Sequence, residues 1–160
     1  MPILTISGVP YNYPTNLQEA GWGEDATGWA QAVTDMLSAL VANGDILPST
    51  NAIQNNITTL TNIDGMFFNS DIVRSARIDY SVYRVSDTTP SGVVESGMML
   101  IALNDTAPVG QKWSITQYKN GDSGVQFTLL DSGQVQYKSS DVGITNYTGN
   151  IKFTAKVLNK

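Results

Sequence analysis

Aspartate and glutamate are the side chains here with the strongest capacity for acid–base chemistry, because the chain contains neither histidine nor cysteine. The familiar nucleophilic triads and thiolate metal sites need those two residue types. A carboxylate pair for glycoside hydrolysis could still be drawn from Asp105, Asp122 and Asp131. These residues lie among turn-forming residues, where an Asp side chain commonly bonds the local backbone. We therefore predict turn aspartates, no catalytic residue and no enzyme.

Aromatic residues on predicted strands offer a second kind of chemistry, the stacking of a sugar ring. Trp113, Tyr118 and Tyr137 could form such a platform, with Asp122 or Asn120 as its polar partner. Strand aromatics also serve in core or cross-strand packing, so both interpretations are open. The candidate glycan-binding residues are Trp113, Tyr118 and Asp122.

Metal binding has little support in the sequence. Asp and Asn side chains could hold calcium, but no stretch matches the alternating acidic loop of an EF-hand. Three Asn-X-Thr sequons occur, at Asn56, Asn104 and Asn146, and we interpret them as coincidence because the first residues lack the features of a secretion signal. We expect no metal, no cofactor and synthesis in a cytoplasm.

Charge divides the chain into two parts. Only 14% of residues are charged, against a usual figure of about 25%. All nine basic residues lie at or beyond Arg74, so residues 1–73 carry seven carboxylates and no Lys or Arg. Neither part has the dense basic patch that nucleic acid requires, and no apolar run approaches the roughly 20 residues of a membrane span. We expect no nucleic-acid partner and no membrane partner.

The elements at the beginning of the chain are predicted to be an extended arm and a helix. Residues 1–24 contain three prolines and three glycines together with the aromatics Tyr11, Tyr13 and Trp22. A helix is predicted over 26–42, with Asp25 as N-cap and Asn43-Gly44 as its stop. Its apolar face comprises Trp29, Val33, Met36, Leu37, Leu40 and Val41.

A second helix is predicted over 50–63, the stretch TNAIQNNITTLTNI. Ile53, Ile57 and Leu60 recur at steps of four and three, as on one helix face. A short helix so poor in helix-forming residues is marginal unless something packs on it, and Ile at core positions favours three-stranded coiled coils. We expect these three side chains to form the interface of a homotrimer within a stalk of residues 46–66. The alternative is an amphipathic helix that lies on its own β-domain.

Beyond Phe67 the apolar period changes to two, which is typical of half-buried antiparallel strands. Ile78, Tyr80 and Val82 alternate with polar residues, and the same pattern recurs around 97–103, 112–118, 125–129, 134–138 and 151–157. We expect a β-sandwich or jelly roll over 67–160. The predicted fold class is therefore α+β: arm and helix in 1–45, helical stalk in 46–66, and β head in 67–160.

The stretch GVPYNYPTNLQEAGWGEDATGWAQAVTDML resembles a segment near the N-terminus of structural proteins from tailed bacteriophages. The matching residues are Tyr11-Asn12-Tyr13-Pro14, Trp22-Gly23-Glu24, Ala26-Thr27 and Trp29-Ala30. RIDYSVYR, WSITQY, GVQFTLLDSGQVQY and YTGNIKF resemble the β-sandwich heads of phage head-fibre or capsid decoration proteins. The resemblance implies an assembly protein that trimerises on the virion. Because the arm lacks basic residues, we expect it to dock by burying Tyr11, Tyr13, Trp22 and Trp29.

Three functions follow as hypotheses. The first is a trimeric capsid decoration protein or head fibre on the capsid surface, anchored through residues 1–45 to the major capsid protein or another virion structural protein. The second is a tail fibre or spike component whose β head binds a receptor or a host-surface glycan. The third, a hydrolase, would need two carboxylates converging in a cleft.

Overall fold

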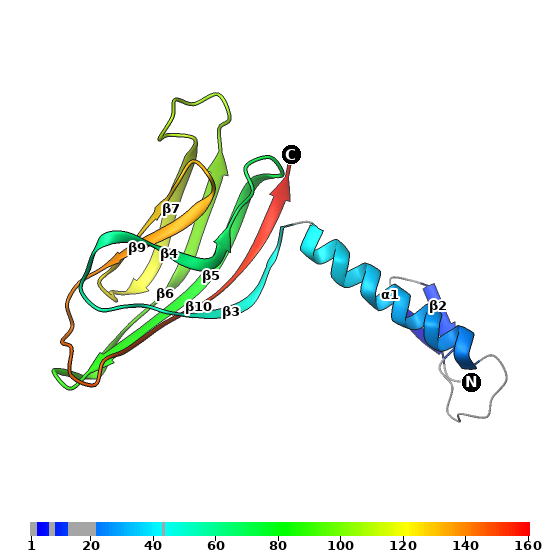
Figure 1. Cartoon of the computed structure of the whole chain (residues 1–160), viewed down its shortest axis with the longest axis horizontal. Coiled ribbons are helices and arrows are strands. Elements are labelled where there is room, and N and C mark those ends of the chain that lie inside the picture. Colours follow the sequence, from blue (N-terminus) through cyan, green and yellow to red (C-terminus); the bar gives the residue numbers. More distant parts are fainter. Residues whose placement is uncertain (1–2, 7–8, 13–21, 43) are drawn as a thin grey trace. The chain divides into compact units, whose positions relative to one another are not determined.

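The computed structural model describes residues 3–6, 9–12, 22–42 and 44–160. They belong to two compact units, the N-terminal unit Met1–Ala42 and the β unit Asn43–Lys160 (Figure 1). The segment 46–66, expected to be a separate stalk, lies within the β unit.

The N-terminal unit contains a strand pair and a helix. Strands β1 (Ile3–Ile6) and β2 (Val9–Asn12) pair in antiparallel fashion. Helix α1 spans Trp22–Ala42, so the first predicted helix is present and begins four residues earlier than expected. Asp25 therefore lies in the first turn and not at the N-cap. Gly44 follows with a φ of +76°, a backbone conformation that glycine tolerates and that stops helices.

The predicted second helix is wrong, and with it the coiled-coil stalk. Residues 46–67 form two strands, β3 (Ile46–Ala52) and β4 (Ile57–Phe67), on either side of Asn56, whose φ is +53°. Thr50 pairs with Lys152 and Thr61 pairs with Tyr137, both distant in sequence. Thr and Ile suit strands, and Asn suits the turn, so sheet pairing stabilises what helix propensity could not.

The remaining strands confirm the strands that the apolar period of two predicted beyond Phe67. They are β5 (Val73–Ser86), β6 (Thr89–Leu103), β7 (Trp113–Gly121), β8 (Val125–Leu129), β9 (Gln134–Ser139) and β10 (Thr148–Asn159). In the β unit, one antiparallel sheet has the order β3-β10-β5-β6-β7, and a second has the order β4-β9-β8. The described chain is thus mostly β with one helix, which corrects the predicted α+β class with two helices.

The strand order also corrects the jelly-roll alternative. Strands β5, β6 and β7 are consecutive neighbours, and β10 returns beside β5, which is the order of one Greek key. The β8–β9 hairpin is inserted in the long connection and belongs to the other sheet. A jelly roll needs two Greek keys, whereas this order provides one.

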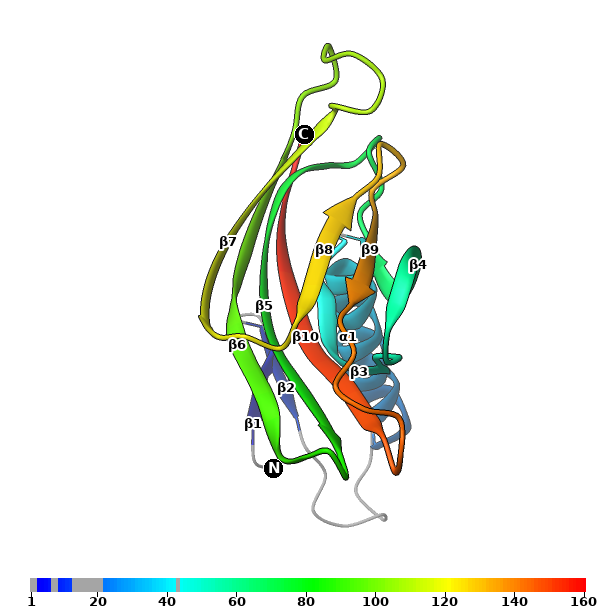
Figure 2. The same cartoon turned by 90° about the vertical axis from the view of Figure 1, so that its left-hand side faces the viewer.

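A single hydrophobic core joins the two sheets of the β unit, which Figure 2 shows as two layers. Ile78, Tyr80 and Val82 of β5 are buried, as their alternation predicted. The opposite sheet contributes Ile63, Met66, Val125, Val135 and Tyr137. Burying each large apolar side chain stabilises the fold by about 1.5–3 kcal/mol.

Candidate binding site and buried polar network

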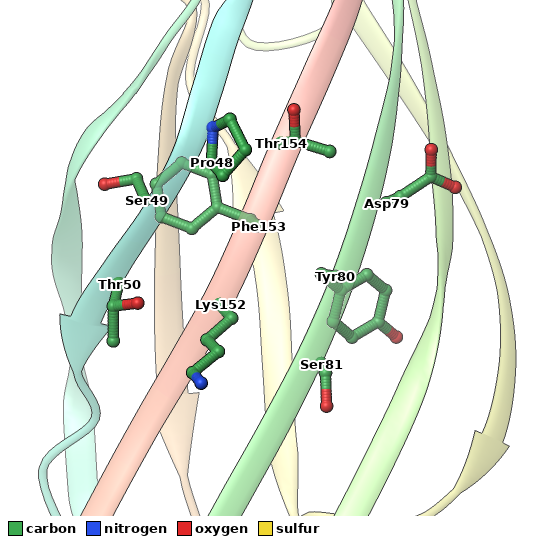
Figure 3. A pocket seen from close by; sticks show the side chains of 9 residues that line it. All are labelled: Pro48, Ser49, Thr50, Asp79, Tyr80, Ser81, Lys152, Phe153 and Thr154. Atoms are coloured by element: carbon green, nitrogen blue, oxygen red, sulfur yellow. The ribbon is translucent and has the colours of Figure 1, made fainter.

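A depression of about 430 Å³ lies on the outer face of the five-stranded sheet, across β3, β10 and β5 (Figure 3). Lys152 on β10 is paired with Thr50 on one side and with Ser81 on the other. Thr154 is paired with Asp79 in the neighbouring row. Directly paired residues present their side chains on the same face of a sheet, so this surface gathers three hydroxyls, an ammonium and a carboxylate.

Strand alternation explains why these side chains point outward. Tyr80 and Phe153 are buried in the core, and successive strand residues face opposite sides. Asp79 and Ser81, which flank Tyr80 in the sequence, therefore point to the outer face of the sheet. Lys152 and Thr154, which flank Phe153, point to the same face. The alternation of residues along β5 and β10 thus supplies both the core side chains and the polar side chains around the depression.

The charges around the depression leave one ammonium unpaired within the described part of the chain. Arg77 Nη2 lies 2.9 Å from Asp79 Oδ1, and Lys156 Nζ lies 2.7 Å from Asp45 Oδ2. The hydrogen bond from Lys156, together with one from the Val157 amide, lowers the pKa of Asp45. Lys152 forms no ion pair with any described residue. Its ammonium and the adjacent hydroxyls can bind a ligand that carries hydroxyl and carboxylate groups.

Glu95 is a fully buried carboxylate inside the β unit. Its Oε1 accepts hydrogen bonds from Tyr80 Oη at 2.7 Å and Gln117 Nε2 at 2.9 Å. Its Oε2 accepts bonds of 3.0 Å from Lys119 Nζ and from both the amide and the hydroxyl of Ser123. Burial raises the pKa of Glu95, but the hydrogen bonds outweigh it, so the pKa lies below its ordinary value. Burial also raises the pKa of Tyr80, which keeps this phenol protonated as a donor.

Arg84 is a second fully buried charge, and within the described residues no carboxylate forms a salt bridge with it. Its guanidinium donates to Ser123 O at 2.6 Å, Asn55 Oδ1 at 2.8 Å and Tyr147 Oη at 3.1 Å, and also to Ser140 O. The Tyr147 ring centroid lies 5.7 Å from Arg84 Cζ. Neutral acceptors from four segments therefore satisfy the guanidinium.

Ser123 joins the two buried charges. Its carbonyl accepts from Arg84 while its amide and hydroxyl donate to Glu95. Because every partner of these charges is supplied internally, this network holds the β7–β8 turn against β5 and β6. We interpret it as a structural network.

Sequence reasoning missed this network, although the strand pattern contained a signal. Ile78, Tyr80, Val82 and Arg84 are every second residue of β5, and all four are buried. The alternation of the strand therefore predicts that Arg84 faces the core. Lys152 and Thr154 alternate with the buried residues of β10, so the same pattern predicts that they face outward. What could not be read locally was which distant residues would meet them.

The predicted glycan residues do not come together. Trp113 is 8% exposed and its Nε1 donates to Asp131 O at 3.3 Å, so it belongs to the core. Tyr118 is 57% exposed on the outer face, opposite to Trp113 because of strand alternation. Asp122 lies in the β7–β8 turn, where its Oδ1 accepts from the Gly124 amide at 2.9 Å. Tyr137, the further aromatic considered, is also buried.

The predicted trimer-interface residues lie in the β unit. Ile53 is 1% exposed and packs in the core of its own chain, so it is not available to another copy. Ile57 is half-buried at the beginning of β4, and Leu60 is 37% exposed on the same strand. These three side chains do not form one helical face, because 50–63 is not a helix.

The predicted virion-contact residues lie in the N-terminal unit. Tyr11 belongs to β2, and Trp22 is the first residue of α1. Tyr13 lies outside the described residues. Trp29 is 40% exposed on α1.

The three aspartates considered for hydrolysis lie in different loops and have structural partners. Asp131 accepts hydrogen bonds from the amides of Gly110 and Lys112, and the former is the main cause of its lowered pKa. Asp105 Oδ2 accepts from Lys160 Nζ at 2.6 Å. Within the described residues, His, Cys, Asp and Glu do not gather in groups of three that could hold a metal. In the same part of the chain, no helix combines the length and the apolar character of a membrane span.

Comparisons with known proteins gave few matches. No family model matches the chain, and no curated protein sequence matches it. Among solved structures, the chain is similar to the tailspike protein of Acinetobacter phage vB_ApiP_P1, with a TM-score of 0.46 and 9% sequence identity. The similarity covers 71% of this chain and 22% of the tailspike chain, so this chain spans less than a quarter of that protein.

Proposed function

We propose that this protein is a structural component of a tailed-phage virion, a homotrimeric capsid decoration protein or head fibre. The resemblance of residues 8–37 to N-terminal segments of phage structural proteins supports the class. The observation that supports separate roles for the two units, docking for the N-terminal unit and an independent fold for the β unit, is the core of the β unit. Where side-chain burial is described, in residues 26–37 and 44–160, all the buried apolar side chains come from Ile53 onward, so the core of the β unit draws on its own residues.

The chemistry of the N-terminal segment suits burial of aromatics and not ionic attraction. Residues 1–42 contain no Lys or Arg, but they contain Tyr11, Tyr13 and Trp22. Aromatic residues of this kind dominate interface energetics when they enter pockets of a partner. We assign these three to the contact with the major capsid protein or another virion structural protein. Trp29, which is 40% exposed on α1, is the fourth aromatic of this contact.

The test is the substitution Trp22→Ala, followed by measurement of how much protein remains on purified virions. Truncating a buried interface aromatic commonly costs about 2 kcal/mol or more, roughly thirtyfold in affinity at one site. Three sites in one trimer multiply that loss through avidity. We expect virions to lose most of the variant, whereas the β-rich circular dichroism spectrum of the soluble protein stays unchanged.

Tyr118→Ala is the matched control, because Tyr118 is an exposed aromatic on the β unit. Its occupancy on virions should equal that of the wild type. Equal occupancy of Trp22→Ala and wild type would contradict the proposed anchor. Absence of the wild-type protein from virions would contradict the proposed class.

The depression on the outer face favours a second candidate, a tail fibre or spike component that binds a glycan. Lys152 lies there beside Thr50 and Ser81 and has no acidic partner among the described residues. A charge-assisted hydrogen bond contributes about 1.5–3 kcal/mol, so Lys152→Ala should weaken binding of an acidic oligosaccharide about tenfold or more. Calorimetric titration of purified protein measures this effect.

Lys138→Ala is the control for this second candidate, because Lys138 is an exposed lysine on β9 of the other sheet. It should bind the oligosaccharide as the wild type does. If the wild type binds neither acidic nor neutral oligosaccharides, the decoration function remains as proposed and the glycan function is rejected.

A further inference from the structure

A second row of paired side chains borders the depression on the outer face of the five-stranded sheet. Asn150 on β10 is paired with Ala52 on β3 and with Tyr83 on β5, and Tyr83 is paired with Val94 on β6. This row lies about 7 Å along the strands from the row that contains Lys152, because residues two apart share a face. The two rows therefore form one continuous surface.

Tyr83 presents an aromatic ring on this surface. It is 40% exposed, and Val94, its partner on β6, is 53% exposed. A β-carbon at Gly92 would lie 2.8 Å from Tyr83 Cε2 and 3.1 Å from its Cζ, so the end of the ring occupies the space above that glycine. Contact with the Gly92 backbone thus positions the ring, while part of it stays open to a ligand.

Three polar side-chain groups of the two rows have no hydrogen-bond partner in the part of the chain that the structure describes. They are the Lys152 ammonium, the Asn150 amide and the Tyr83 hydroxyl. Figure 3 shows the Lys152 side chain extending along β10 away from Thr154, which is the direction of Asn150. An ammonium donates up to three hydrogen bonds, and an amide both donates and accepts them. The surface can therefore bind carboxylate and hydroxyl oxygens.

The charges on this face favour an anionic ligand, although the chain has a formal net charge of −5. The outward positions of β5 and β10 carry one acidic and three basic residues, namely Asp79, Arg77, Lys152 and Lys156. Asp79 forms an ion pair with Arg77, and Asp45 forms one with Lys156. Asp79 lies in the row on the other side of Lys152 from Tyr83. The ammonium without an ion pair is thus next to the aromatic ring and on the side away from the acid.

A pyranose ring that carries a carboxylate matches these groups. One face of such a ring consists largely of C–H groups and can stack on an aromatic side chain, whereas its hydroxyls lie around the rim. Its carboxylate can accept charge-assisted hydrogen bonds from the Lys152 ammonium. Its hydroxyls can exchange hydrogen bonds with the Asn150 amide, which lies between Tyr83 and β3.

We propose that Tyr83 is the stacking residue of a subsite for an acidic sugar unit, in which Lys152 binds the carboxylate and Asn150 binds hydroxyls. The inference rests on the glycan-binding candidate of the proposed function, and it names the subsite and the class of sugar. The subsite differs from the site predicted from the sequence, because Tyr118 of that prediction lies two strands away on β7.

The experiment is calorimetric titration of the full chain with two probes, tetragalacturonic acid and its methyl ester. The ester has the same rings but no carboxylate, so we expect the wild type to bind the acid about tenfold more tightly. Tyr83→Ala should weaken binding of both probes about five- to tenfold, because stacking on the ring does not require the charge. Tyr83→Phe keeps the ring and should stay within about threefold of the wild type.

Tyr118→Ala is the matched control, because Tyr118 is 57% exposed on the same face of the same sheet. We expect it to bind both probes as the wild type does. The circular dichroism spectrum of each variant shows whether the β unit is folded.

A second variant, Asn150→Asp, keeps the inference testable if Tyr83→Ala disturbs β5. It has the size of the native residue but places a carboxylate beside Lys152 and the bound sugar. Like charges that face each other across an interface oppose binding. We expect Asn150→Asp to bind the acid about tenfold more weakly and to bind the methyl ester about as the wild type does.

The outcomes separate this inference from the functions on which it rests. If Tyr83→Ala binds both probes as the wild type does, the stacking role is overturned and the glycan-binding candidate stands. Equal weakening of both probes by Asn150→Asp overturns the assigned place of the carboxylate. A wild type that binds neither probe overturns the subsite and the glycan-binding candidate together. Virion occupancy, tested separately with Trp22→Ala, is affected by none of these results.

Discussion

Replacing Arg84 with methionine is expected to lower the free energy of unfolding of the β unit by about 3–5 kcal/mol. The substitution removes a fully buried guanidinium and takes away the donor of Ser123 O and Tyr147 Oη. Asn55 Oδ1 and Ser140 O also lose the guanidinium, but each keeps one backbone amide as donor, that of Val142 and that of Asn56. A buried polar atom that loses its partner costs about 1–3 kcal/mol, because water cannot replace the bond. Urea denaturation followed by circular dichroism at neutral pH measures the change.

Arg77→Met is the matched control, because it removes the same charge from an exposed position. The Arg77 side chain is 59% exposed and pairs with an exposed Asp79. Surface ion pairs contribute about 0–1 kcal/mol, so this variant should stay close to the wild type. Equal stability of Arg84→Met and Arg77→Met would show that the buried guanidinium is replaceable and that our structural interpretation is wrong.

Replacing Glu95 with glutamine should cost about 2–4 kcal/mol at neutral pH. The carboxylate accepts five hydrogen bonds, and three of them converge on Oε2. A glutamine amide of the same shape must place its NH₂ group against donors on one side, because Lys119, Ser123, Tyr80 and Gln117 all donate. The exposed Asp71 supplies the control Asp71→Asn, for which we expect a change within about 0.5 kcal/mol.

The effect of Glu95→Gln should depend on pH in one direction. The folded state lowers the pKa of Glu95 below the ordinary value of 4.5, so the folded state favours the carboxylate more strongly than the unfolded state does. Its contribution is therefore complete above about pH 4.5 and is lost as the pH falls through the folded pKa. The stability difference between wild type and variant should stay constant from neutral pH down to about pH 4.5 and shrink as the pH falls further. A difference that grows on acidification would contradict the assigned protonation state.

Helix α1 and strands β5 to β10 were predictable because their patterns are local and repeated. Inward residues such as Ile78, Tyr80 and Val82 alternate because each strand has one face in the core. The apolar stripe of α1 repeats over several turns, which distinguishes it from a strand. In both cases many residues report the same period, so one exception does not change the assignment.

Residues 50–63 show where local reasoning failed. Ile53, Ile57 and Leu60 match helical spacing over less than three turns, too few residues to exclude other structures. Asn56 places a turn inside this match, and the inward residues of β4 are Ile63 and Met66. Pairing with β9 and β10 decided the outcome, and those partners lie about 75–100 residues further along the chain. Weak helix propensity could not compete with that pairing.

The sequence by itself determined helix α1, strands β5 to β10, the division of charge and the absence of histidine and cysteine chemistry, because these depend on residue type or on neighbours within a few positions. The tertiary structure decided which side chains meet. It placed Trp113 in the core and Tyr118 on the opposite face, and it gathered Lys152, Thr50 and Ser81 on three paired strands. It also surrounded Arg84 with acceptors 29 to 63 positions away. Such contacts follow from the register of strands that are distant in sequence, and no local period encodes that register.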